Sequence, residues 1–207
     1  MTVTGSKALL LLSGGVDSTS VAAWTRPELA VSIDYGQVCA RAERAAADRV
    51  AVEIGLPVRH LQLSAAELGR GLLAEPFDGR DVGDDGGAAE FWPFRNQLLI
   101  TAAAAVAYDA GLSRVLVGTV RTDGSRHVDG TVEFVQRMSE LCGMQEGGIS
   151  VDAPAIEMST VELVEVSEAP MSLLGWTHSC HTGDVACGRC PGCAKRNAVF
   201  NDLDSRR

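Results

Sequence analysis

The segment from residue 13 to residue 18, SGGVDS, carries the residue types that hold phosphate. An aliphatic run precedes it and small residues follow it, so we expect a buried strand, a tight turn and then a helix. Paired glycines let the backbone turn sharply, and the start of a helix presents free N–H groups. Ser13 and Ser18 add hydroxyl donors, and Asp17 could hold a magnesium ion. The pattern predicts an anion-binding loop, against the plainer alternative of an ordinary strand-to-helix turn.

This segment lacks the lysine of a Walker A loop. It resembles instead the pyrophosphate loop of the ATP pyrophosphatases, which cleave ATP between its α and β phosphates and activate a carboxylate or carbonyl as an adenylate. The resemblance implies binding of ATP with Mg²⁺. The residues expected at ATP are Leu12, Ser13, Gly14, Gly15, Val16, Asp17, Ser18, Thr19, Asp34 and Gly118.

A second group with chemical potential is a cluster of cysteines near the end of the chain. Cys180, Cys187, Cys190 and Cys193 supply four thiols within fourteen positions. Four cysteines with short C-x2-C spacings are typical of a structural zinc site, with Lys195 and Arg196 expected to offset its negative charge. An iron–sulfur cluster and a redox dithiol remain alternatives.

Further polar residues follow predicted strands or begin predicted helices. Residues 34–37, DYGQ, end a strand expected over 29–34. Arg95 and Asn96 begin a helix expected over 97–110, where a cation opposes the helix dipole unless an anion is present. Arg95 is therefore a candidate phosphate or carboxylate ligand, with a plain surface arginine as the alternative. Residues 121–130 are expected to form a polar loop beyond a strand end.

These residues must be positioned by alternating strands and helices. We expect helices from Ser18 to before Pro27, over 41–54, over 131–143 and from a capping box at Ser159, and strands over 58–63, 114–120 and 151–156. This alternation predicts an α/β fold: a doubly wound, mostly parallel, Rossmann-like sheet. We expect an ATP-binding domain over residues 1–170 and a zinc-binding segment over 171–207 packed on it.

Composition narrows the classes of function. The formal net charge is −9, which argues against a broad nucleic-acid surface. No apolar run is long enough to span a membrane and the first residues lack a signal-peptide pattern, so we expect a cytoplasmic protein. Residues 76–90 hold four glycines and five acidic residues, which predicts disorder or a mobile loop over the pocket mouth.

Taken together, the loop at 13–18, DYGQ at 34–37, PFRN at 93–96 and the cysteine-rich tail resemble the 7-cyano-7-deazaguanine synthase family nearly end to end. The resemblance implies an adenine nucleotide α-hydrolase-like fold, structural zinc on the four cysteines and a homodimer. It implies adenylation of 7-carboxy-7-deazaguanine with ATP, attack by ammonia to give the amide, and a second ATP-dependent step to the nitrile. The catalytic residues it implies are Asp17, Ser18, Arg95 and Asp129. The substrate-binding residues it implies are Tyr35, Gln37, Arg95, Asn96, Asp129, Glu133 and Phe134, with Asp129 and Glu133 reading the guanine-like edge.

Three departures from the family pattern stand out. Val38 and Cys39 occupy the usual arginine-histidine positions, and residues 127–134 match the usual substrate loop only loosely. The lysine expected before the late helix is replaced at Ser159-Thr160. A cation near the departing pyrophosphate stabilises developing charge, so Arg95 or a loop arginine must serve, or the chemistry differs.

Three other functions remain open at this point. Relatives in antiphage operons couple the activated deazaguanine to a partner protein amine, and the altered loops favour this alternative. A tRNA-thiolating ATP pyrophosphatase would use the cysteines as sulfur carriers or cluster ligands. A nucleotide-binding module without catalysis is the simplest alternative.

Overall fold

A computed structural model describes residues 7–74 and 92–206. The acidic segment 76–90 therefore lies outside the described residues. In the part described, no helix is both long and apolar enough to cross a membrane.

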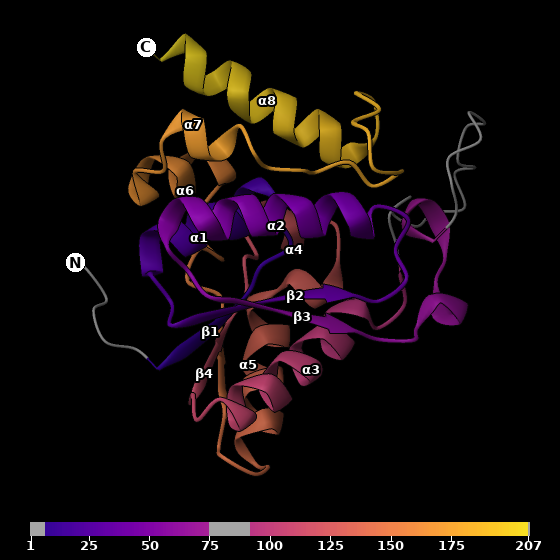
Figure 1. Cartoon of the computed structure of the whole chain (residues 1–207), viewed down its shortest axis with the longest axis vertical. Helices are drawn as coiled ribbons and strands as arrows, with labels where there is room; N and C mark the ends of the chain where they lie inside the picture. Colours follow the sequence, from indigo (N-terminus) through magenta and orange to yellow (C-terminus); the bar gives the residue numbers. More distant parts are fainter. Residues whose placement is uncertain (1–6, 75–91, 207) are drawn as a thin grey trace.

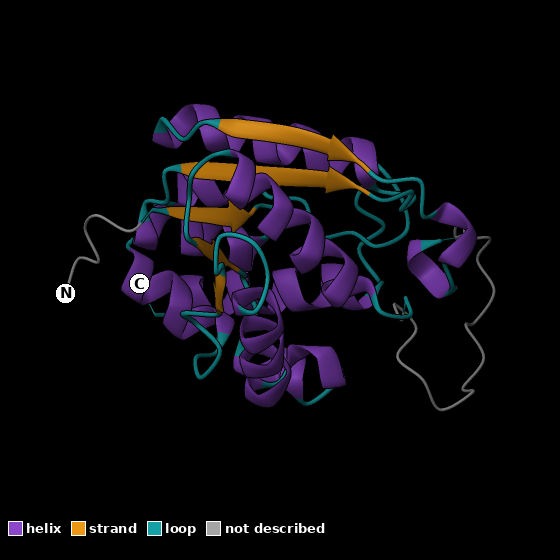
Figure 2. Ribbon diagram, turned by 90° about the horizontal axis from the view of Figure 1, so that it is seen from below, coloured by secondary structure: helices purple, strands orange, loops and turns teal. Residues whose placement is uncertain are grey.

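The centre of the fold is a five-stranded sheet in the order β3-β2-β1-β4-β5, and every neighbouring pair is parallel. Figure 2 shows strands running side by side in one direction. The strands are β1 (Ala8–Leu11), β2 (Leu29–Asp34), β3 (Val58–Gln62), β4 (Arg114–Leu116) and β5 (Ser150–Asp152). The chain winds outward from β1 in both directions, so β1 and β4 flank the point where strand order reverses, the usual ligand position in this architecture. The predicted α/β fold class is confirmed.

Helices cover both faces of the sheet (Figure 1). One face carries α1 (Val16–Thr25), α2 (Ala40–Ile54), α6 (Thr160–Ser167), α7 (Met171–Leu174) and α8 (Pro191–Ser205). The other carries α3 (Arg95–Asp109) and α5 (Val132–Gly143). Short turns of helix occupy η1 (Ala66–Leu68), η2 (Gly71–Leu73), α4 (Arg121–Gly124) and η3 (Val128–Gly130).

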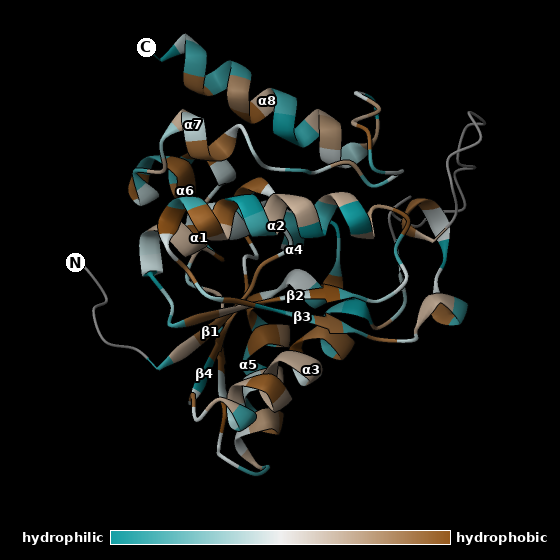
Figure 3. Ribbon diagram, in the orientation of Figure 1, coloured by the Kyte–Doolittle hydropathy of each residue, from teal (hydrophilic) through white to brown (hydrophobic). Residues whose placement is uncertain are grey.

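Two apolar cores follow from the alternation of side chains along the strands. In β1, Leu10 packs into the core beneath α1 and α6, whereas Leu9 packs into the core beneath α3 and α5. Figure 3 shows hydrophobic residues along the central strands and hydrophilic ones at the C-terminal end of α8. Leu174 and Val199 belong to the same core as Leu10, so the C-terminal segment packs directly on the sheet layer. The division of the chain at residue 170 stays a prediction.

Two strands are shorter than predicted, and one predicted loop is partly helical. β4 ends at Leu116 because the chain then leaves the ladder to let Gly118 pass against α1, where a Cβ would lie 2.9 Å from Ser18 Cα. β5 ends at Asp152, two residues before Pro154, which has no N–H for a ladder. Residues 121–130 form α4 and η3 rather than an open loop. Asp123 stabilises α4 by accepting the N–H of Val120 at 3.1 Å.

Candidate active site

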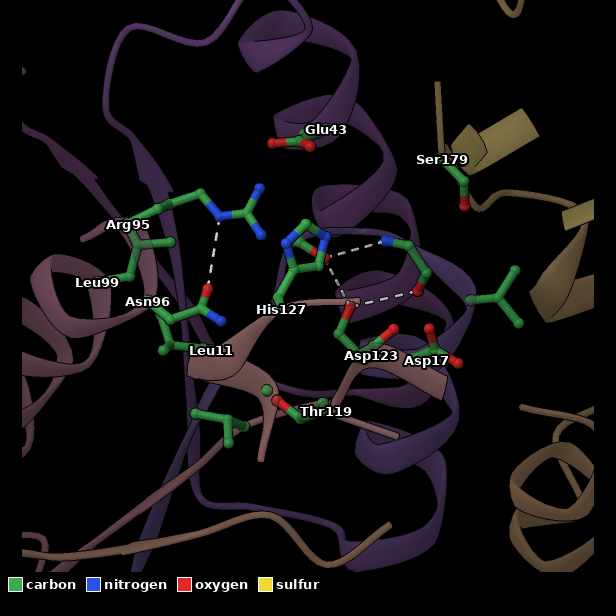
Figure 4. Close-up of a pocket in the computed structure, with 18 of the residues that line it drawn as sticks. Leu11, Asp17, Glu43, Arg95, Asn96, Leu99, Thr119, Asp123, His127 and Ser179 are labelled. Carbon is green, nitrogen blue, oxygen red and sulfur yellow. Dashed lines mark hydrogen bonds between the residues drawn. The ribbon is translucent and has the colours of Figure 1, made fainter. Parts of the chain in front are cut away.

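A cavity of about 360 Å³ opens at the carboxyl ends of the central strands. Figure 4 shows Arg95, Asn96 and Leu99 on one side of it, Asp17 and Asp123 on the other, and His127 between them. Eleven of the predicted ATP- and substrate-binding residues line it together: Leu12, Ser13, Gly15, Val16, Asp17, Ser18, Tyr35, Arg95, Asn96, Gly118 and Asp129.

The 13–18 loop turns from β1 into the start of α1. Gly14 has φ +78°, and a Cβ there would lie 2.7 Å from the backbone oxygen of Glu43, so only glycine fits against α2. Gly15 is the N-cap of α1, which leaves the first N–H groups of the helix without intrahelical partners. The hydroxyls of Ser13 and Ser18 lie 3.1 Å apart at the cavity wall. This is the arrangement expected of an anion-binding loop, and anion binding there stays a prediction.

Asp17 is the centre of a charged network that joins four parts of the chain. Its Oδ1 accepts the Thr160 hydroxyl at 2.7 Å, from the start of α6. Its Oδ2 accepts the ammonium of Lys195 at 2.9 Å, from the first turns of α8. The same ammonium donates to Asp123 Oδ1 at 3.0 Å. One lysine thus lies between two carboxylates at the mouth of the phosphate loop.

Burial and neighbouring charges shift the pKa values of Asp17 and Lys195 in opposite directions. Burial raises the pKa of Asp17, although Lys195 opposes that rise. Burial by itself would lower the pKa of Lys195, but the carboxylates of Asp17 and Asp123 outweigh it and raise that pKa. Lys195 therefore carries its positive charge at neutral pH.

The opposite wall is formed where the PFRN segment enters α3. Phe94 adopts a left-handed conformation, φ 56°, at the N-cap, and Arg95 and Asn96 follow in the first turn. Asn96 donates from Nδ2 to the backbone oxygen of Asp129 at 3.0 Å, which ties this wall to η3. Arg95 lines the cavity, as an anion ligand must.

A second carboxyl group, Glu43 on α2, also lines the cavity. Its Oε2 accepts Gln37 Nε2 at 2.7 Å, and its Oε1 accepts the thiol of Cys39 at 3.4 Å. Burial of the carboxyl group raises the pKa of Glu43, and burial also raises the pKa of the Cys39 thiol. Cys39 therefore stays a thiol and acts as a hydrogen-bond donor to Glu43.

Six predicted site residues do not line the cavity: Gly14, Thr19, Asp34, Gln37, Glu133 and Phe134. Gly14 packs on α2, and Thr19 is buried within α1. Asp34 accepts the N–H of Gly36 at 3.0 Å, so its carboxylate stabilises the turn after β2. Gln37 is buried and accepts the Tyr35 N–H at 2.9 Å, so it supports Tyr35 and Glu43 from behind.

The placement of Glu133 and Phe134 corrects the predicted substrate loop. Both lie in the first turn of α5, where Val135 faces the core. The side chain of Glu133 is 80% exposed and Phe134 packs against the core beneath α3 and α5. Neither reaches the cavity that Asp129 lines.

Lys195 and Glu43 are among the residues of the site that sequence reasoning missed, together with Asp123 and Thr160. Lys195 was expected to balance the cysteine cluster, yet it is directed at Asp17 and Asp123. Arg196 donates to Thr177 Oγ1 and stacks 4.2 Å from the Phe200 ring centroid, so it is not directed at the sulfurs either. Lysine occurs only twice in the chain, at positions 7 and 195, which is a signal for Lys195. The sequence holds no comparable signal for Glu43 beyond its position six residues after Gln37.

The four cysteines converge as predicted. Their sulfurs all lie within 4.8 Å of one another, and two pairs, Cys180–Cys190 and Cys187–Cys193, are 4.0 Å apart. A tetrahedral Zn–S₄ centre with bonds near 2.3 Å needs sulfurs about 3.8 Å apart, so the cluster can bind zinc.

The surroundings of the sulfurs also suit a metal. Backbone N–H groups of His181 and Cys193 donate to the Cys190 sulfur. Although burial raises it, hydrogen bonds from Thr182 and from backbone N–H groups lower the pKa of Cys187 to about 6, whereas burial raises the pKa values of Cys190 and Cys193. Thiolates are the form that binds metal. Gly192 lets the first turn of α8 pack against the chain at Ser179, since a Cβ there would lie 1.9 Å from the Ser179 oxygen.

Comparison with known proteins gives one consistent family. The family model described as queuosine biosynthesis protein QueC matches residues 7–204. Similar proteins include the 7-cyano-7-deazaguanine synthase of Xanthomonas oryzae pv. oryzae, 32% identical over 95% of this chain and 93% of the relative. The proteins of the same name from Campylobacter curvus and Acidobacterium capsulatum are 31% and 28% identical over 94% and 99% of this chain, and over 92% and 96% of their own.

Proposed function

Because this chain belongs to the queuosine biosynthesis protein QueC family, we propose that it is an ATP-dependent ligase that makes 7-cyano-7-deazaguanine from 7-carboxy-7-deazaguanine and ammonia. The geometry of the cavity supports this proposal independently of family membership. The free N-terminus of α1 and the Arg95–Asn96 wall face one cavity, so a nucleotide and a second, carboxylate-bearing ligand can meet there.

In this proposal the loop 13–18 and the first N–H groups of α1 bind the ATP phosphates. Asp17 and the hydroxyls of Ser13 and Ser18 offer the oxygen ligands that Mg²⁺ prefers. Magnesium, when bound with ATP, neutralises phosphate charge. Arg95 orients the substrate carboxylate for in-line attack on the α-phosphate, and pyrophosphate leaves with the bridging oxygen. Catalysis is then mostly positioning and charge stabilisation.

The remaining steps use the same site. Ammonia attacks the carbonyl of the acyl adenylate, AMP leaves, and the amide forms. The amide oxygen then attacks the α-phosphorus of a second ATP, pyrophosphate leaves and the amide nitrogen loses one proton. Loss of AMP and of the second nitrogen-bound proton leaves the nitrile. Asp129 accepts hydrogen bonds from the guanine-like edge of the substrate. Glu43, in the same cavity, takes the second such role in place of the exposed Glu133.

We infer a structural role for zinc on Cys180, Cys187, Cys190 and Cys193, because the four sulfurs leave no open position for a substrate. Metal analysis checks this inference. One zinc per chain is the expected result, whereas iron with sulfide would favour the tRNA-thiolation alternative.

The decisive experiment combines the purified protein with ATP, Mg²⁺, 7-carboxy-7-deazaguanine and ammonium. We expect ATP–pyrophosphate exchange that depends on the deazaguanine acid, followed by product masses of the amide and then the nitrile. The acid without its carboxylate is the matched control and should support no exchange. Absence of exchange from protein shown to be folded would contradict the proposed function. Exchange with neither amide nor nitrile would exclude ammonia as the acceptor and favour conjugation to a protein amine.

A further inference from the structure

Lys195 occupies the place from which a cation can reach the phosphates of bound ATP. Its ammonium lies 2.9 Å from Asp17, inside the phosphate loop, and it lines the cavity. Its second partner, Asp123, lies at 3.0 Å on α4. The aliphatic stem starts on α8, 178 positions away in sequence from Asp17, so only the fold brings them together.

Of the other cations expected to serve this role, Arg121 is committed elsewhere and Arg95 lies on another wall. Arg126, the second arginine of the 121–130 segment, also lines the cavity, but Lys195 is the cation placed in direct contact with Asp17. Arg121 donates to the Glu157 oxygen and to Glu162, on the exposed side of α6. Arg95 stands across the cavity from Asp17 (Figure 4). It is placed to hold the attacking carboxylate, not the leaving group.

Thr160 and Lys195 approach Asp17 from two different helices. The Thr160 hydroxyl and the Lys195 ammonium contact the two oxygens of one carboxylate, Asp17, from different elements. Ser159-Thr160 is the place where the family resemblance leads one to expect a lysine. A lysine at 160 and a lysine at 195 would therefore deliver their charge to the same point.

We propose that Lys195 is the cation that stabilises the departing pyrophosphate, in the adenylation reaction that the proposed function assigns to this site. As the carboxylate oxygen bonds to the α-phosphorus, the bond to the bridging oxygen breaks and the electron pair stays on pyrophosphate. The Lys195 ammonium exchanges Asp17 for the phosphate oxygens that gain this charge, and Asp17 becomes available to magnesium.

The cysteine cluster sets the position of this lysine. Cys190 is the N-cap of α8 and Cys193 lies in its first turn, two residues before Lys195. Cys193 donates its N–H to the Cys190 sulfur, and the preceding chain is fixed to the phosphate loop by His178 N–H donating to Gly14 O at 2.9 Å. The cluster thus holds the lysine against the loop.

The test moves the charge from one element to the other. Lys195→Met should lower the rate of ATP–pyrophosphate exchange about 100-fold. It should weaken pyrophosphate binding, measured by calorimetry, about tenfold, while AMP binding changes little. Thr160→Lys added to Lys195→Met should recover at least about tenfold of the exchange rate, because the new ammonium reaches Asp17 from α6.

The control is Lys7→Met, the same chemical change at the other lysine, which is exposed and outside the cavity. It should match the wild type in exchange and in pyrophosphate binding. Zinc content and melting temperature show that each variant is folded.

Two results would overturn the proposal while leaving the proposed function intact. The first is wild-type exchange and pyrophosphate affinity in folded Lys195→Met. The second is a double variant no better than Lys195→Met, which would show that charge at this point is not what the reaction uses. Absence of exchange in the wild type would contradict the proposed function itself, and with it the role of Lys195 that rests on that function.

Discussion

At the scale of single residues, the cavity holds two carboxyl groups, Asp17 and Glu43, whose pKa values are raised by burial. Their partners differ. Asp17 faces an ammonium, whereas Glu43 is held by the Gln37 amide and the Cys39 thiol, both neutral. Burial outweighs the positive charge of Arg95, which opposes the rise in the pKa of Glu43, so the ionised form of Glu43 is costly in the folded state.

Glu43→Gln is expected to make the protein more stable at neutral pH. The pKa of Glu43 is raised in the folded state, so the stabilisation from its protonated form is complete below about pH 4.5 and is lost as pH rises through the folded pKa. Glutamine mimics the protonated form at every pH and can still accept from Gln37. The melting temperature of Glu43→Gln minus that of the wild type should increase between pH 4.5 and pH 8.

Glu133→Gln is the matched control for this prediction, because Glu133 is exposed and lies outside the cavity. The melting temperature of Glu133→Gln minus that of the wild type should not change between pH 4.5 and pH 8. A flat difference for Glu43→Gln as well would show that the Glu43 carboxyl group is no more costly to ionise in the folded state than in the unfolded one.

At the scale of elements, the phosphate loop depends on how closely β1, α1 and α2 approach. Gly14 lets the loop lie on α2, and Gly118 lets the chain beyond β4 lie on the start of α1. These contacts place the free N–H groups of α1 at the cavity. The conformation of the loop therefore depends on the packing of β1, α1 and α2 as well as on the six residues 13–18.

Gly14→Ala should destabilise the protein and weaken ATP binding. The new methyl group meets backbone of α2 at 2.7 Å, and φ is +78°, so strain adds to overlap. We expect a loss of about 2–4 kcal/mol in the free energy of unfolding. Chemical denaturation measures this loss, and ATP titration measures the loss of affinity.

Gly55→Ala separates strain from overlap. Gly55 has a similar φ, +67°, at the end of α2, but nothing lies within 4 Å of its Cβ position. We expect a cost of about 1 kcal/mol there and unchanged ATP binding. Equal costs for the two variants would contradict the close packing of the loop on α2.

At the scale of the whole molecule, the C-terminal segment is part of the active site. It contributes Lys195 to the cavity and Leu174 and Val199 to the main core. On the proposed function, a metal bound by the cysteine cluster would therefore support both folding and phosphate binding.

Cys190→Ser should lower zinc content, melting temperature and pyrophosphate affinity together. A metal present at 100 times its Kd contributes about 2.7 kcal/mol, or roughly 5–10 °C for a chain of this size. Pyrophosphate binding should weaken because, without the metal, the start of α8 is no longer held and Lys195 loses its position. The serine hydroxyl can still accept the N–H of residue 193, so the N-cap of α8 is kept. Cys142→Ala is the control, since Cys142 is buried in the other core and should keep the zinc. Pyrophosphate affinity that survives loss of zinc would contradict this coupling.

The sequence by itself determined the local pieces. The strand over Leu29–Asp34, the helix Ala40–Ile54 and the capping box at Ser159 follow from periodicity, glycine and capping signals that act within a few residues. The cysteine cluster also follows from local spacing.

Only the tertiary structure decided which polar residues share the cavity. Three predicted residues with suitable polar side chains do not line the cavity. Asp34 stabilises the turn after β2, and Gln37 is buried in hydrogen bonds behind Tyr35. Glu133 lies on the exposed face of α5. Lys195 and Glu43 enter because α8 and α2 pack against the phosphate loop. Such contacts join residues far apart in the chain, and their geometry depends on how helices pack on the sheet, which no local pattern encodes.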